Sequence, residues 1–240
     1  MSSEPGFADP GGGIRPLIVR RSARALRMRL VVDPRDGAVK LTVPARANLA
    51  AAYRWAESKR DWIEATIAAL PAPAPFADGA TVPFQGREYQ LDWQADAPRK
   101  VTIEGDRIVI GGPQELAGRR VLRWLRSEAL AVLNEETAYY ARLAGVTPGR
   151  VGIGDPHTRW GSCSSSGDIR YSWRLILAPV EVRRATVAHE VGHRLHMDHS
   201  AAFHAAVKRL FGRDPGPERA WLRANGSRLH TFGRAKKTAD

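Results

Sequence analysis

The sequence predicts an α+β fold in which a helix with a metal-ligand motif lies beside a small mixed or antiparallel sheet. Strand-like alternation of apolar and polar residues is found in four segments, residues 14–32, 39–43, 81–93 and 101–110. A helix is expected after Pro179, because the apolar residues that follow it are spaced for one buried face. A β-rich N-terminal region with one helix is expected to precede this domain.

The N-terminal region is divided by its turn and cap signals. Residues 1–13 lack the basic start and apolar stretch of a secretory signal, and a loose, disordered tail is expected there. Residues 14–75 are expected to form a β-hairpin around Asp33-Pro34-Arg35-Asp36-Gly37, then a helix. Asn48 is a good N-cap for that helix, which should run to about Leu70 before a proline-rich connector.

The rest of the chain is expected to form three further regions. Residues 76–112 should form a small β region of two strand pairs, with a turn at Gly105-Asp106. Residues 113–215 should form the core, which opens with a helix from about Gln114 to Leu143 closed by Gly145. Strands are expected at 149–153 and 168–173, and residues 216–240 are expected to form a partly disordered C-terminal extension.

The most informative motif is His189-Glu190-Val191-Gly192-His193. On a helix, His189 and His193 lie one turn apart on the same face, so two imidazoles can bind one metal ion. Glu190 can then reach a metal-bound water as general base. This combination is typical of a zinc hydrolase, most often a peptidase.

The third ligand is chosen by geometry. If the helix continued, His196 would stand roughly 10 Å along the axis from His189, an awkward reach for bonds of about 2.0–2.1 Å. If the helix ends near residues 196–198, the chain can turn and bring His199 under the metal, as in the three-histidine metzincin spacing. The predicted ligands of a Zn²⁺ ion are therefore His189, His193 and His199. His196 is expected to be a neighbouring group, and His204 to be packed or exposed.

The segment before the metal helix has a predicted role in binding substrate. Residues 158–173 could supply an edge strand that holds an extended peptide by backbone pairing, with Gly161 allowing close approach. Arg159 could stabilise an oxyanion or make a structural ion pair, and both interpretations stay open. For Tyr171 a structural hydrogen bond is favoured. Cys163, the single cysteine, excludes an internal disulfide and is expected to be an inert packing residue.

Several ordered motifs together resemble the YgjP-like metallopeptidase family, which is related to the SprT-like and WLM zinc proteases. They are Thr158–Ser165, Ser172–Pro179 and His189–Phe203, with Arg20-Arg21-Ser22, Lys59–Ile63 and Gly86–Tyr89 in the N-terminal half. The resemblance covers roughly residues 14–232. It implies a zincin-like catalytic domain with His189, His193 and His199 as zinc ligands and Glu190 as catalytic acid/base. Many relatives carry an aromatic pair where this chain has Phe203-His204, which leaves the lining of the pocket open.

Composition and charge suggest the partners. The formal net charge is +12, and between Arg15 and Asp61 twelve basic residues face four acidic ones. Such a surface can attract phosphate backbones, although a charged run is usually a solvated face. The leading prediction is a zinc metallopeptidase acting on a protein or peptide. The alternative is a zinc-braced, nucleic-acid-associated binding module without peptidase activity.

The remaining expectations concern the environment of the protein. No apolar run reaches the ~20 residues that span a bilayer, so no membrane partner is expected. A single cysteine fits a reducing interior, and a cytoplasmic location is expected. The sequence does not predict the oligomeric state.

Overall fold

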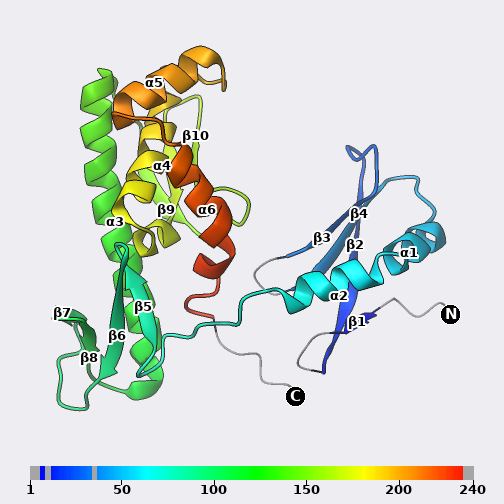
Figure 1. Cartoon of the computed structure of the whole chain (residues 1–240), viewed down its shortest axis with the longest axis horizontal. Coiled ribbons are helices and arrows are strands. Elements are labelled where there is room, and N and C mark those ends of the chain that lie inside the picture. Colours follow the sequence, from blue (N-terminus) through cyan, green and yellow to red (C-terminus); the bar gives the residue numbers. More distant parts are fainter. Residues whose placement is uncertain (1–5, 9–11, 34–36, 235–240) are drawn as a thin grey trace. The chain divides into compact units, whose positions relative to one another are not determined.

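The structure, a computed structural model, describes residues 6–8, 12–33 and 37–234 (Figure 1). The described residues form two compact units, the first up to Ala72 and the second from Pro73 onward. The expected α+β class is confirmed, since six α-helices accompany three mixed sheets in the described residues. None of the helices there combines the length and apolar character needed to cross a bilayer.

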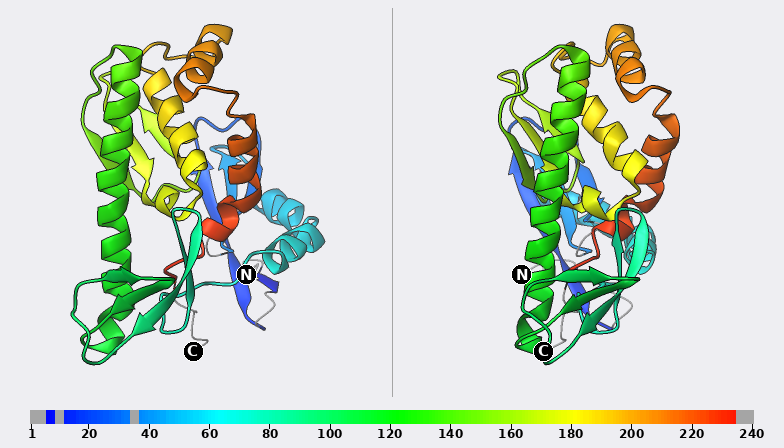
Figure 2. Two further views of the ribbon diagram at one scale, coloured as in Figure 1. Left: turned by 60° about the vertical axis from the view of Figure 1, so that its left-hand side comes forward. Right: turned by 90° about the vertical axis from the view of Figure 1, so that its left-hand side faces the viewer.

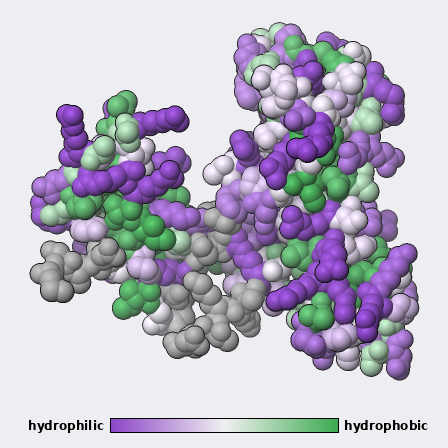
Figure 3. All heavy atoms as spheres, turned by 180° about the vertical axis from the view of Figure 1, so that it is seen from behind, coloured by the Kyte–Doolittle hydropathy of each residue, from purple (hydrophilic) through white to green (hydrophobic). Residues whose placement is uncertain are grey.

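The first unit is a four-stranded sheet with two short helices on one face (Figures 1 and 2). Its elements are β1 (Gly6–Ala8), β2 (Ile14–Ser22), β3 (Arg29–Val32), β4 (Val39–Pro44), α1 (Leu49–Glu57) and α2 (Arg60–Ala68). The strand order is β1-β2-β4-β3, with β2 and β4 parallel and β3 and β4 antiparallel. Alternate strand residues such as Leu17 and Leu41 meet Ile63 of α2 in one core. Hydrophilic side chains cover much of the face of this unit seen in Figure 3.

The first unit differs from the prediction at its beginning. Residues 6–8, expected in a loose tail, pair with β2, because Phe7 is fully buried in the core. Residues 1–5 and 9–11 of that expected tail lie outside the described residues, as do residues 34–36 of the predicted turn. The hairpin itself is present, with β3 and β4 on either side of this turn.

The strand-like alternation over residues 14–32 corresponds to two strands, and the expected single helix from Asn48 to about Leu70 is wrong, because two helices lie there. The strand is interrupted between β2 and β3, where Leu26 is 94 % exposed. Asn48 does cap α1, but the helix stops at Ser58, whose hydroxyl donates to the carbonyl of Trp55. The break lets both short helices turn apolar residues into the same core.

The second unit begins with a small sheet beside the first turns of a long helix (Figure 2). The strands are β5 (Thr81–Phe84), β6 (Arg87–Trp93), β7 (Thr102–Glu104) and β8 (Arg107–Ile110), in the order β5-β6-β8-β7. The two expected strand pairs and the turn between Glu104 and Arg107 are confirmed. Phe84 packs on Trp124 of the long helix, with ring centroids 4.9 Å apart.

The remaining elements surround one buried helix, α4 (Val180–Gly192). They are the 3₁₀ turn η1 (Gln114–Leu116), α3 (Ala117–Ala144), β9 (Val151–Gly154), β10 (Gly161–Cys163), β11 (Ile169–Ser172), the 3₁₀ turn η2 (Trp173–Leu177), α5 (Ala201–Phe211) and α6 (Gly216–Leu229). Gly145 ends α3 in the left-handed conformation, as expected. The sheet order is β10-β11-β9, which places β10 at an edge beside α4. Residues 216–229 of the expected C-terminal extension form α6, which packs on α4, and residues 235–240 of that extension lie outside the described residues.

A buried ion pair joins α4 to α3. The guanidinium of Arg183, only 2 % exposed, donates two hydrogen bonds to the carboxylate of Glu136, at 2.9 and 3.1 Å. Arg184 approaches the same carboxylate at 3.4 Å. Because a bidentate contact restrains both position and rotation, this pair fixes α4 against the long helix.

Replacing Glu136 with glutamine should destabilise the second unit by about 3–5 kcal/mol, because the buried guanidinium of Arg183 loses its counter-charge. Chemical unfolding followed by circular dichroism measures this change. The matched control is Glu135→Gln on the same helix turn, which removes an exposed carboxylate and should have little effect. Equal stability of the two variants would show that the ion pair does not hold α4.

Candidate metal centre

The metal helix α4 ends earlier than the sequence suggests. It starts after Pro179, carries an acidic residue in its first turn and is buried along most of its length. Its regular part stops at Gly192 rather than near residues 196–198. A Cβ at Gly192 would lie 2.7 Å from a methyl of Val207, so only glycine lets α5 approach this closely. The amides of Leu195 and His196 both donate to the carbonyl of Gly192, which turns the chain back toward the site.

The turn brings the three predicted ligands together. His189, His193 and His199 offer ring nitrogens that all lie within 4.8 Å of one another. The Nε2 atoms of His189 and His199 are 3.4 Å apart. Two nitrogens bound tetrahedrally at about 2.05 Å to one zinc ion would be about 3.3 Å apart. The spacing therefore fits two ligands of a shared ion.

The surroundings orient the imidazoles. The Nδ1 atom of His193 lies 3.2 Å from the carbonyl oxygen of His196, an arrangement that leaves Nε2 of His193 for a metal. His196 thus acts on the site through its backbone, consistent with its expected place as a neighbour. His204 is exposed, with its ring 6.3 Å from that of His199.

Phe203 is the supporting residue whose role the sequence analysis missed. Its fully buried ring contacts all three imidazoles, with centroids 4.9 Å from His189, 4.5 Å from His193 and 4.9 Å from His199. The signal was present in the sequence, because Phe203 is an apolar residue four positions after His199. Ser200 caps α5 by accepting a hydrogen bond from the amide of Phe203, which starts the helix at this point.

The surroundings of His189 and His193 favour their neutral forms. Burial lowers the pKa of His189 to about 4, and repulsion by Arg219, and by the neighbouring imidazoles of His193 and His199 when they are protonated, adds to this effect. Burial also lowers the pKa of His193. Neutral imidazoles have the free lone pair that a metal ion needs. This donor set therefore fits a divalent metal ion.

Glu190 lies beside His189 and is 5 % exposed. Burial raises the pKa of its carboxyl group to about 7, although Arg159 acts in the opposite direction. The backbone of β10 runs directly against this side chain. A Cβ on Gly161 would lie 2.4 Å from Oε1 and 2.6 Å from Cδ of Glu190. Glycine at 161 is thus what allows the strand and the carboxylate to lie together.

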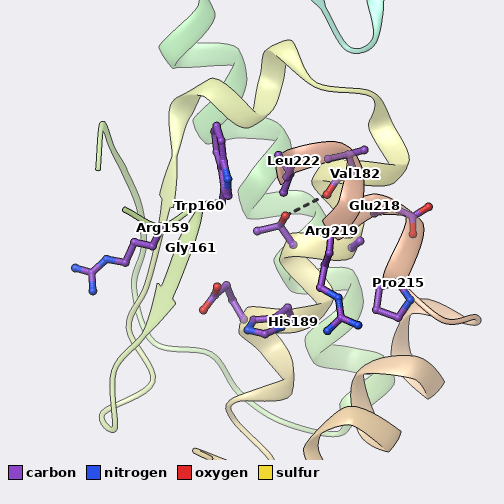
Figure 4. A pocket seen from close by; sticks show the side chains of 12 residues that line it. Arg159, Trp160, Gly161, Val182, His189, Pro215, Glu218, Arg219 and Leu222 are labelled. Atoms are coloured by element: carbon purple, nitrogen blue, oxygen red, sulfur yellow. Dashed lines mark hydrogen bonds between the residues drawn. The ribbon is translucent and has the colours of Figure 1, made fainter. Parts of the chain in front are cut away.

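The other residues considered from the sequence have mainly structural surroundings. The hydroxyl of fully buried Tyr171 is hydrogen-bonded to Oγ1 of Thr137 at 3.0 Å, in line with the favoured structural role. Burial raises the pKa of the Cys163 thiol, which disfavours the reactive thiolate. Arg159 lines the pocket beside Glu190, but Figure 4 shows its guanidinium pointing away from that pocket.

The comparison with protein families agrees with this geometry. A family model described as "YgjP-like, metallopeptidase domain" matches residues 26–225. The chain belongs to the YgjP-like family. No curated protein and no solved structure matches the chain. Membership of a metallopeptidase family and a cluster of three histidines both indicate a metal ion.

The YgjP-like protein should bind about one divalent metal ion per chain, and His199→Ala should lose most of it, because two imidazoles remain. Metal content after dialysis, measured by inductively coupled plasma mass spectrometry, tests this. His196→Ala and His204→Ala are matched controls that should keep the metal. Full occupancy in His199→Ala would exclude His199 as a ligand.

Proposed function

We propose that this YgjP-like protein is a zinc-dependent peptidase with a zincin-like catalytic domain. The observation that carries the proposal is the buried carboxylate of Glu190, which follows His189 of the three-imidazole cluster and lies against the edge strand β10 at Gly161. The proposed catalytic domain extends the expected range of residues 113–215 by the helix α6, which lines the pocket next to Glu190.

Zinc is the metal that best suits this donor set. His189, His193 and His199 would hold it, since neutral imidazoles are favoured zinc ligands and catalytic zinc sites have three protein ligands. When bound, Zn²⁺ supplies Lewis acidity, which polarises a carbonyl group and lowers the pKa of water.

The reaction needs a group that moves protons, and the buried carboxylate next to His189 supports Glu190 in this role. Its carboxylate would take a proton from the attacking water and deliver it to the amine that leaves when the peptide bond breaks. A carboxyl group whose pKa is raised to about 7 by burial can both accept and release a proton near neutral pH. Its contact with Gly161 restricts where the carboxylate can lie.

The edge strand offers a way to hold the substrate. One side of β10 pairs with β11, and no other strand of the described residues pairs with its opposite side. An extended peptide could add to this free side by backbone hydrogen bonds. Because Gly161 belongs to this strand and contacts Glu190, such pairing would bring a peptide bond close to the catalytic carboxylate.

The alternative of a zinc-braced module that binds nucleic acid is not favoured. Zinc ions with a structural role are normally enclosed by four protein ligands. The cluster found in the described part of the chain has three members, and the nearby His196 contributes its carbonyl to His193 instead.

Glu190→Gln should retain the metal and lower peptidase activity by about 10²-fold or more, because the proton acceptor is lost while the ligands stay. Cleavage of unfolded casein and of a fluorogenic peptide library, with metal content measured on the same samples, tests this. Glu181→Gln, an exposed carboxylate on the same helix, is the matched control. Activity of Glu190→Gln equal to that of the control would reject Glu190 as the proton acceptor.

Gly161→Ala should also lower activity with little change in metal content, because the added methyl group occupies the position of the Glu190 carboxylate. Gly152→Ala in β9 is the matched control, since a Cβ there meets no atom within 4 Å. Kinetics of both variants on one substrate provide the test. If the two substitutions have equal effects, the contact between β10 and Glu190 has no catalytic importance.

A further inference from the structure

A pocket next to the catalytic site lies between α4 and α6, with a volume of about 230 Å³ (Figure 4). One face of α4 and one face of α6 form two sides of the pocket. The residues just before β10 form the third side. Its lining includes Val182, Ala185 and His189 of α4, Arg219 and Leu222 of α6, and Trp160. The pocket therefore begins at a predicted metal ligand and runs back along the metal helix.

Most of the side-chain surface in this pocket is apolar, and its aromatic wall is fixed. The ring of Trp160 stacks on buried His230, with centroids 5.2 Å apart and planes inclined by 27°. On α6, a Cβ at Gly226 would stand 3.0 Å from the indole of Trp160, so the helix packs directly against it. Because His230 and α6 both pack against Trp160, the shape of the pocket is defined before a ligand binds.

Arg219 is a charged residue of the pocket whose side chain is not in an ion pair with the described residues. Its guanidinium has no acidic partner among the described residues, and Figure 4 shows it in the space between His189 and Pro215. The other cation lining the pocket, Arg159, points away from it. Glu218, which also lines the pocket, is paired with Arg213. A substrate thus meets an unpaired positive charge at one end of an apolar cavity.

We infer that the pocket binds an apolar substrate side chain next to the cleaved bond, while Arg219 binds a carboxylate of the same substrate. The inference rests on the proposed peptidase function for the statement that the ligand is a substrate. A cavity of about 150 Å³ accommodates benzene, so a pocket of this size accepts a side chain such as leucine or phenylalanine. The carboxylate can come from the C-terminus of the peptide or from an adjacent acidic residue.

Binding to zinc-loaded Glu190→Gln protein tests the inference without turnover. The probes are fluorescein-labelled pentapeptides followed by fluorescence anisotropy. In the first pair both peptides end in leucine, and one has a free C-terminal carboxylate whereas the other has a C-terminal amide. The second pair is amidated and carries aspartate or asparagine directly after the leucine. The carboxylate-bearing member of at least one pair should bind about tenfold or more tightly, the effect of one charge-assisted hydrogen bond. The pair that discriminates identifies the source of the carboxylate.

Variants in α6 assign this preference to a residue. Adding Arg219→Gln should abolish the preference and keep zinc content and thermal stability, whereas Arg219→Lys should keep part of it. Arg223→Gln removes another exposed cation of the same helix, outside the pocket, and should leave the preference intact. Exchange of leucine for glycine should weaken binding of every probe.

Three results would overturn the inference. They are equal binding within both pairs, a preference that survives in Arg219→Gln, and tighter binding when lysine replaces leucine, which would assign the pocket to Glu218 instead. A separate assay of cleavage by the wild-type protein distinguishes failure of this inference from failure of the proposed peptidase function. Discrimination without any cleavage would reject the peptidase activity alone, and cleavage without discrimination would reject the role of Arg219 alone.

Discussion

The second unit depends on the burial of a carboxylate in its interior. Placing Glu190 at 5 % exposure is unfavourable for the charged form of the group, and the rise of its pKa to about 7 is the direct consequence. The surrounding structure has to hold α4 in place despite this cost. It does so through the ion pair of Arg183 with Glu136 on α3 and through the close contact with β10 at Gly161.

Two kinds of feature could be predicted from the sequence. Features set by local periodicity include the placement of His189 and His193 one turn apart and the end of α3 at Gly145. The short reach of a metal–nitrogen bond and an expected turn after the helix together predict His199 as the third ligand. The structure brings His199 close to His189 and His193. A few neighbouring residues decide each of these features.

The features that could not be predicted depend on contacts between residues far apart in the chain. Phe7 forms part of a strand because a core built by later residues covers it. The close approach of α5 to Gly192 depends on Val207, a later residue of the chain that the local pattern does not reveal. Arg219 lies in a segment that the sequence suggested was an extension, and only the packing of α6 on α4 places it beside His189.

The predicted ligands lie within eleven residues of one another, whereas the pocket combines Trp160 with residues near position 220. The entropy lost on closing a loop increases with its length, so the short loop from His193 to His199 is easily closed. The turn that carries the three imidazoles is therefore the part of the site with the lower entropic cost of ordering. The walls of the pocket join Trp160 to Arg219 and Leu222, so their closure needs the packing of distant segments and costs more chain entropy.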